Sequence, residues 1–195
     1  MKPLWKKWLG VIVAIAFAGS LVALAGCSSP ANNASTSASS EESSESGESA
    51  GMPNPWSDVA SAEEAAKGAG LDAFPLPAGA IGDLGEPIQV TYRCMDGMAE
   101  AYYEFPAAAL TVRTAALAEG DSFDVSGDYN TYKYEWTETI DNTPVACAGN
   151  REGDSTKTYW GEDKVAHSIV AEGLGGDDAF GLNVDRLTVF VEAMK

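Results

Sequence analysis

Basic residues are scarce in this chain. Of its 195 residues only 12 are Lys or Arg, whereas 29 are Asp or Glu, which gives a formal net charge of −17 at pH 7. So acidic a protein is repelled by nucleic acid and by anionic lipid, and no basic patch in the sequence opposes this repulsion. We therefore expect no nucleic-acid partner, and we expect repulsion between copies of the chain to favour a monomer.

Histidine and cysteine are also rare. Histidine occurs once, as His167, and cysteine three times, as Cys27, Cys94 and Cys147. One histidine and cysteines so far apart do not make a zinc site. The sequence also shows no Gly-x-Ser-x-Gly elbow between a strand and a helix, no phosphate-binding loop and no paired Cys/His motif. It therefore identifies no catalytic residue, metal ligand or cofactor, and it predicts a protein that is not an enzyme.

The longest apolar run lies at the N-terminus. Leu9–Leu24 contains no charged residue, and three lysines precede it, as in a secretory signal. The run ends at Leu24-Ala25-Gly26-Cys27, which resembles the lipobox of bacterial lipoproteins. This resemblance implies that residues 1–26 are a cleaved signal peptide and that Cys27 carries acyl chains such as palmitate. The protein would then lie on the extracytoplasmic face of the cell membrane, held there by its lipid anchor.

An uncleaved signal anchor is the alternative, because the apolar run approaches the length of a membrane span. The segment after the cysteine consists almost wholly of Ser, Ala, Asn, Gly and Glu. Such a composition cannot form a core, so residues 27–52 are predicted to be a disordered tether. Its glutamates, Glu41, Glu42, Glu45 and Glu48, repel one another and extend it. The alternative for this acidic cluster is a tail that binds cations or basic partners.

Residues 53–195 carry the patterns of a single globular domain. Ser61-Ala62-Glu63-Glu64 is a capping box that predicts a short helix ending at Gly68 or Gly70. A second helix is predicted over Asn183–Met194, where apolar residues recur at helical spacing. Alternating apolar and polar residues predict strands at 88–94, 98–105, 110–113, 131–140, 143–148, 156–160 and 164–171. Together these elements predict an α+β fold: an antiparallel β-sheet meander of about six strands, packed by the C-terminal helix, with a short N-terminal helix.

Cys94 and Cys147 both lie in strand-like segments of this domain. An oxidising compartment favours disulfides, and two cysteines remain once Cys27 is acylated, so we predict a bridge between them. The alternative is two separate buried thiols, since free cysteine packs as a small apolar side chain.

Aromatic side chains provide the candidate ligand site. Tyr132, Tyr134 and Trp136 fall on one face of a predicted strand, and Trp160 ends another strand. Aromatic residues aligned on a sheet can bind a sugar, a peptide or a lipid. The same residues could equally form the core, because strands favour aromatic side chains and a small sheet needs them.

Two further groups of residues have simple structural explanations. His167 shares a strand face with Val165 and Ile169, which favours packing over general base catalysis. The loop before residue 131 offers the oxygen atoms that a calcium ion needs: Asp121, Asp124, Asp128 and Asn130. Their spacing is not that of an EF-hand, and Asp and Asn are common turn residues, so we predict turns there.

The end of the chain shows a recurring order of segments: Thr158-Tyr159-Trp160, Gly161-Glu162-Asp163, His167-Ser168-Ile169-Val170 and Asn183–Met194. This order resembles a family of unknown function found in bacterial lipoproteins and in membrane-anchored, anti-sigma-factor-like proteins. Asp124–Asn130 also resembles a run in related exported lipoproteins. The resemblance implies an architecture and a location, and it supplies no catalytic residues.

The sequence therefore predicts an extracytoplasmic lipoprotein whose domain binds or senses an envelope protein or a small ligand without catalysis. The alternative is a carrier that holds a lipid or another apolar ligand on the concave face of the sheet. A cell-envelope hydrolase is the third possibility.

Overall fold

The computed structural model describes residues 54–176 and 180–195, all of which belong to one compact unit, Ala50–Lys195. The predicted signal peptide, Cys27 and the predicted tether lie outside the described residues. No helix in the described part of the chain is long and apolar enough to cross a membrane.

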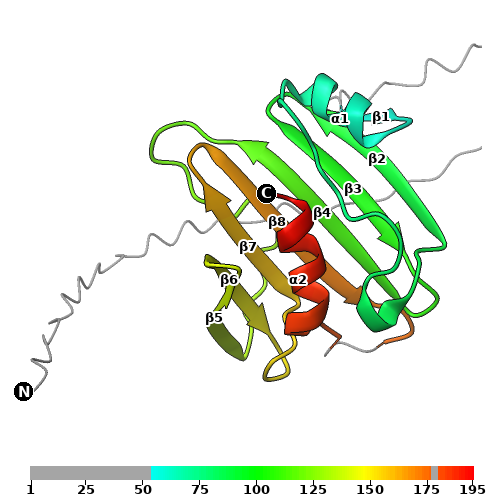
Figure 1. The fold of residues 1–195 in the computed structure, drawn as a ribbon, viewed down its shortest axis with the longest axis vertical. Coiled ribbons are helices and arrows are strands. Elements are labelled where there is room, and N and C mark those ends of the chain that lie inside the picture. Colours follow the sequence, from blue (N-terminus) through cyan, green and yellow to red (C-terminus); the bar gives the residue numbers. More distant parts are fainter. Residues whose placement is uncertain (1–53, 177–179) are drawn as a thin grey trace, which may run out of the picture. The chain divides into compact units, whose positions relative to one another are not determined.

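Eight antiparallel strands form one sheet in the order β1-β2-β3-β4-β8-β7-β6-β5 (Figure 1). The strands are β1 (Ser57–Val59), β2 (Gln89–Met95), β3 (Met98–Glu104), β4 (Ala108–Ala116), β5 (Tyr134–Ile140), β6 (Thr143–Gly149), β7 (Lys157–Glu162) and β8 (Val165–Gly173). Two consecutive meanders, β1–β4 and β5–β8, join where β4 pairs with β8. The predicted α+β class and antiparallel meander are confirmed. The sheet has eight strands rather than about six, in part because β1 is too short to show an alternating pattern.

Two α-helices pack on the same face of the sheet, which we call the helix-covered face. They are α1 (Ala62–Ala69) and α2 (Val184–Ala193), and a 3-10 helix, η1 (Gly82–Leu84), contacts α2. α1 begins where the Ser61 hydroxyl accepts a hydrogen bond from the Glu64 amide at 3.2 Å. It ends at Gly70, whose φ of 71° is the left-handed conformation that glycine adopts freely. Asn183 is the N-cap of α2, because its side chain accepts a hydrogen bond from the Arg186 amide at 3.0 Å.

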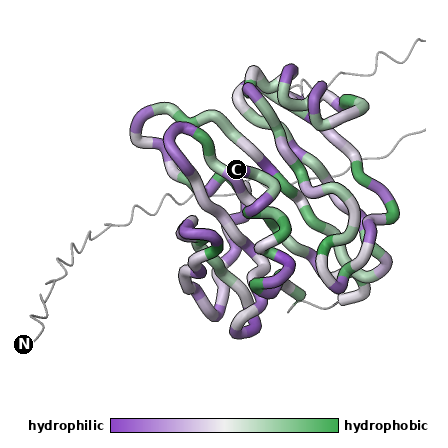
Figure 2. The backbone as a smooth tube through the Cα atoms, in the orientation of Figure 1, coloured by the Kyte–Doolittle hydropathy of each residue, from purple (hydrophilic) through white to green (hydrophobic). Residues whose placement is uncertain are grey.

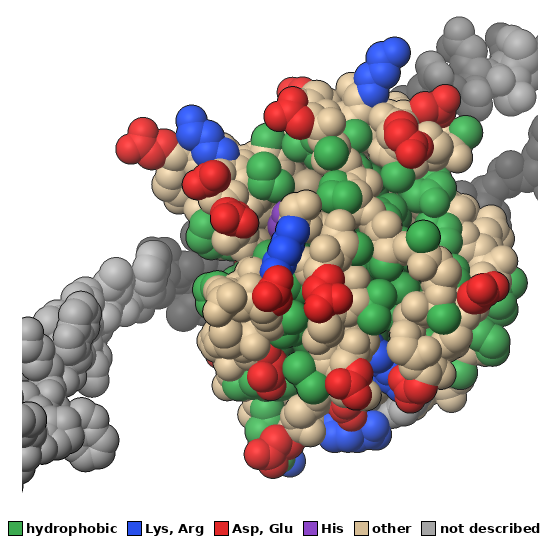
Figure 3. Space-filling view, viewed as in Figure 1, with side chains coloured by type: hydrophobic (Ala, Val, Ile, Leu, Met, Phe, Trp, Pro, Cys, Tyr) green, Lys and Arg blue, Asp and Glu red, His purple; other side chains and the backbone are tan. Residues whose placement is uncertain are grey.

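The core lies between the sheet and these helices. Leu187, Phe190 and Val191 of α2 are fully buried, and the Phe190 ring meets Tyr103 of β3 edge-on at 5.7 Å between centroids. Hydrophobic stretches of the backbone run through the central strands, whereas hydrophilic stretches lie mostly in the turns (Figure 2). On the surface seen from the α2 side, acidic side chains outnumber basic ones (Figure 3). On this side of the domain the acidic side chains therefore lie at the surface, and the buried apolar side chains lie beneath it.

No helix of residues 54–176 or 180–195 lies on the other face of the sheet, which we call the open face. Residues 117–133 form a long loop that takes the chain from β4 to β5 at the edge of the sheet. This crossover loop lies against the open face, since a Cβ at Gly161 of β7 would collide with the Phe123 ring. Trp160 is buried on the helix-covered face, so the next residue, Gly161, faces the open side of the sheet. Because glycine has no side chain, the loop can approach the strand closely at this position.

Candidate functional site

Of the four aromatic residues predicted to form a ligand face, Trp160 lies in the core and Trp136 packs against it. Trp160 is 4% exposed and packs in the core, with its ring 5.2 Å from that of His167. Trp136 and Tyr134 lie on the same face of β5, as predicted, and Trp136 packs against the core. Tyr132 precedes β5 and donates a hydrogen bond to Asp128 within the crossover loop. These positions favour the core interpretation of Trp136 and Trp160.

The predicted bridge between Cys94 and Cys147 is not formed, and both residues are free, buried thiols. Cys94 lies on β2 and Cys147 on β6, with β3, β4, β8 and β7 between them. Five inter-strand steps span roughly 24 Å along the sheet, whereas a disulfide needs Cα atoms within about 7 Å. The sheet order is therefore incompatible with the bridge, and the alternative of two packed thiols holds.

His167 occupies a buried position on the helix-covered face of β8. Its Nδ1 atom lies 2.9 Å from the Thr114 hydroxyl of β4, and the residue is only 7% exposed. Burial lowers the pKa of the imidazole to about 4, because the positive form loses its hydration. The predicted packing role is confirmed, and the side chain is neutral at neutral pH.

The open face carries a row of charged side chains that come from four adjacent strands. Strand register places Asp58, Arg93, Glu100 and Arg113 side by side, in that order, across β1, β2, β3 and β4. Glu100 is 3% exposed, and its two carboxylate oxygens accept from Arg93 Nε at 2.5 Å and Arg113 Nε at 2.7 Å. We call these four residues the charge row. Glu100 is a buried acid that holds two guanidinium groups in fixed positions.

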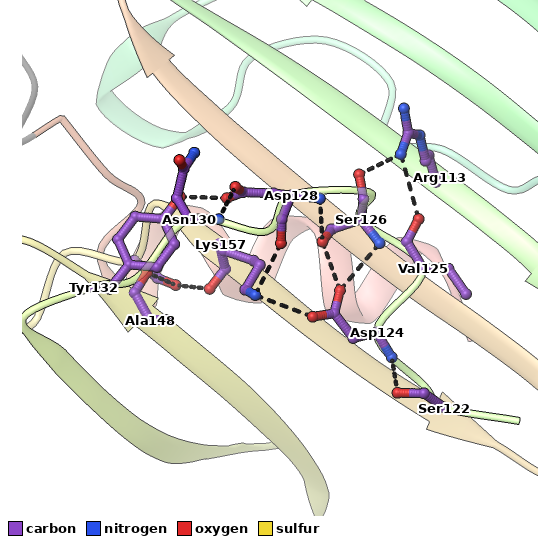
Figure 4. A network of polar contacts seen from close by, with 11 residues as sticks. Arg113, Ser122, Asp124, Val125, Ser126, Asp128, Asn130, Tyr132, Ala148 and Lys157 are labelled. Carbon is purple, nitrogen blue, oxygen red and sulfur yellow. Dashed lines mark hydrogen bonds and ion pairs between the residues drawn. The ribbon is translucent and has the colours of Figure 1, made fainter. Parts of the chain in front are cut away.

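Trp56 stacks against both of these arginines, and the crossover loop also binds Arg113. The guanidinium carbon of Arg93 lies 4.5 Å from the Trp56 ring centroid, and that of Arg113 lies 5.7 Å from it. Arg113 also donates from Nη1 to the backbone carbonyls of Val125 and Ser126 (Figure 4). The arginines are thus held by ion pairing, ring stacking and, for Arg113, backbone contacts.

A second polar group fastens the crossover loop to β7 (Figure 4). Lys157 donates to the Asp124 carboxylate at 3.0 Å and to the Asp128 carbonyl at 3.2 Å. Burial by itself raises the pKa of the Asp124 carboxyl, but hydrogen bonds from Ser126 and Lys157 outweigh it and lower this pKa. Asp124 also accepts from the Ser126 amide at 3.1 Å, and Asp128 accepts from the Asn130 amide at 2.9 Å.

These contacts are those of turn residues, as predicted for the loop. The fourth residue of the proposed calcium group, Asp121, accepts from the Ala118 amide at 2.8 Å. In the part of the chain that the structure describes, no three His, Cys, Asp or Glu side chains are grouped so as to hold a metal ion. The loop carboxylates are engaged by amides, hydroxyls and one ammonium group.

One buried polar atom on the open face has no partner among the described residues. The Ser168 hydroxyl of β8 is completely buried and makes no hydrogen bond. Register places Ser168 directly beside Arg113 and Tyr159, beneath the part of the crossover loop that Arg113 binds. A buried hydroxyl of this kind is expected to bind an ordered water molecule.

No family model, curated protein or solved structure matches this chain. A binding role for the domain therefore has to be inferred from the geometry of the open face. The charge row and Trp56 were not predicted from the sequence. Arg93, Glu100 and Arg113 alternate with apolar residues along their strands, which predicts that they face away from the core. This alternation does not predict which residues of neighbouring strands lie beside them.

Proposed function

We propose that this protein is an extracytoplasmic lipoprotein, anchored through Cys27, whose domain binds a ligand or partner on its open face without catalysing a reaction. The observation that supports a binding site is the restrained charge row, because the guanidinium group of Arg93 is held by Glu100 and Trp56 while its side chain remains 40% exposed. A guanidinium group held in this way is preorganised for recognition. The lipobox-like sequence ending at Cys27 supports the anchor.

The absence of catalysis is proposed because three groups that general acid–base or nucleophilic chemistry could use, His167, Lys157 and Ser168, are occupied or inaccessible. His167 is buried and neutral, the Lys157 ammonium is paired with Asp124, and Ser168 lies beneath the crossover loop. A general base or nucleophile must reach its substrate.

The carrier alternative would require the helix-covered face to open. The three apolar side chains of α2 that fill it are fully buried, so a lipid would have to displace the helix. Native mass spectrometry of the purified protein tests this alternative, since a carrier retains an apolar ligand of definite mass.

The anchor is tested by the intact mass of the protein extracted from its native membrane with detergent. We expect the mass of residues 27–195 plus acyl groups, and we expect Cys27→Ala to abolish both the cleavage and the acyl mass. A mass equal to the full chain would mean that the apolar run is an uncleaved span, and the lipoprotein proposal would be withdrawn.

A further inference from the structure

The open face is hollowed beside the charge row. A shallow depression of about 380 Å³ lies over β1–β4 and is lined by Asp58, Thr91, Arg93, Tyr102 and Thr111, among others. Its volume falls at the lower end of the range for small-ligand sites. Register places Tyr102 of β3 between Thr91 of β2 and Thr111 of β4, so a ring with a hydroxyl on either side forms the floor.

The wall of this depression has unused hydrogen-bonding capacity of both kinds. Arg93 gives only its Nε to Glu100, and its terminal nitrogens bind nothing in the described residues. Asp58 faces Arg93 across β1 and β2, and its carboxylate has no hydrogen-bond partner among the residues that the structure describes. The Arg93 guanidinium group, a hydrogen-bond donor, therefore lies beside the Asp58 carboxylate, an acceptor. Contacts with Glu100 and Trp56 hold the guanidinium group in place.

The charges at this site balance, although the chain as a whole carries −17. Asp58, Arg93 and Glu100 line the depression, and Arg113, which lies outside its lining, is paired with Glu100, so these four charges sum to zero. A ligand hydroxyl group can both donate and accept hydrogen bonds, so it can bond to the adjacent guanidinium and carboxylate groups of Arg93 and Asp58. Tyr102 is 37% exposed, and a tyrosine side chain combines an apolar ring face with a polar tip.

We propose that this depression binds a neutral oligosaccharide, with the ring of Tyr102 under one sugar and Arg93 and Asp58 bonded to its hydroxyls. The aromatic ring covers the C–H face of the sugar, and the two threonine hydroxyls add further polar contacts. The inference rests on the proposed binding role of the open face and does not depend on the lipid anchor.

The test is isothermal titration of the detergent-solubilised full chain with three tetrasaccharides: chitotetraose, maltotetraose and the acidic tetragalacturonate. We expect saturable binding of at least one neutral tetrasaccharide and no binding of tetragalacturonate. Tyr102→Ala should weaken the binding about tenfold or more, whereas Tyr102→Phe should retain most of it because the ring remains.

Tyr129→Ala is the matched control. Tyr129 is 95% exposed on the crossover loop and does not line the depression, so the same substitution there should leave binding unchanged. Arg93→Gln is expected to weaken binding, and unfolding curves of all variants check that each is folded. The inference is overturned if neither neutral tetrasaccharide binds at millimolar concentration, if only tetragalacturonate binds, or if Tyr129→Ala and Tyr102→Ala have equal effects. The intact mass described above tests the anchor separately, so the two proposals fail by different results.

Discussion

The single histidine of this chain makes its pH dependence unusually simple to test. His167 is buried against Trp160 and Thr114, and burial lowers its pKa from 6.5 to about 4 in the folded state. The unfolded chain regains the ordinary value and therefore binds a proton more readily than the folded chain between these two values. Because the folded-state pKa is the lower one, the contribution of the neutral imidazole to the free energy of unfolding is complete above pH 6.5 and is lost as the pH falls towards 4.

The size of this effect follows from the two pKa values. At pH 5 most unfolded molecules carry the proton and most folded molecules do not, which lowers the free energy of unfolding by about 2 kcal/mol relative to pH 7.5. His167→Gln removes the titration but keeps a side chain that can hydrogen-bond to Thr114. Urea unfolding of wild type and variant at a series of pH values measures the difference.

We expect the variant to be less stable at pH 7.5 and to lose less stability on acidification, so that the two curves converge near pH 5. Carboxylates contribute equally to both proteins and cancel in the comparison. Parallel curves would refute the reasoning, because they would show that the imidazole takes up its proton equally well in the folded state.

Two further substitutions test the packing and the charge row. Gly68→Ala in α1 should destabilise the domain by about 1–3 kcal/mol, because the new Cβ collides with Cys94 Sγ, although alanine has the higher helix propensity. Unfolding of Gly68→Ala, Cys94→Ala and the double variant should show that the two effects are strongly non-additive, and additive effects would contradict the contact. Glu100→Gln should lower the free energy of unfolding by about 1–3 kcal/mol, because it leaves two guanidinium groups without their carboxylate. Glu135→Gln, at an exposed position, is the control in the same unfolding assay, and equal effects of the two substitutions would argue against the buried pairing.

Local patterns predicted the elements of this fold well because they depend on neighbouring residues alone. The alternation along β5 appears in the structure as alternating half-buried and exposed side chains up to Ile140, although the strand begins at Tyr134 rather than at residue 131. Both helix starts follow from single capping side chains, Ser61 and Asn183. Capping and periodicity act within one or two turns or a few strand residues, so a sequence displays them directly.

The strand order could not be obtained in this way. A simple meander would place β5 beside β4, but the crossover loop carries the chain to the far edge and β8 takes the place beside β4. What holds this arrangement is a set of contacts between distant residues: Phe123 over Gly161, and Asp124 with Lys157. The disulfide prediction was wrong for the same reason: the sequence does not reveal that β2 and β6, which carry Cys94 and Cys147, are separated by four strands in the sheet.

The charge row shows how such long-range order creates a candidate site. Alternation places Arg93, Glu100 and Arg113 on the solvent side of their strands, and the same pattern would arise if each charge stood alone in water. Only the register aligns them, and a slip of one residue in any pairing would move a charge to the opposite face. Recognition at this surface therefore depends on the accuracy of strand pairing, so variants that weaken the pairing of β2 with β3 should impair ligand binding even when no residue of the depression is changed.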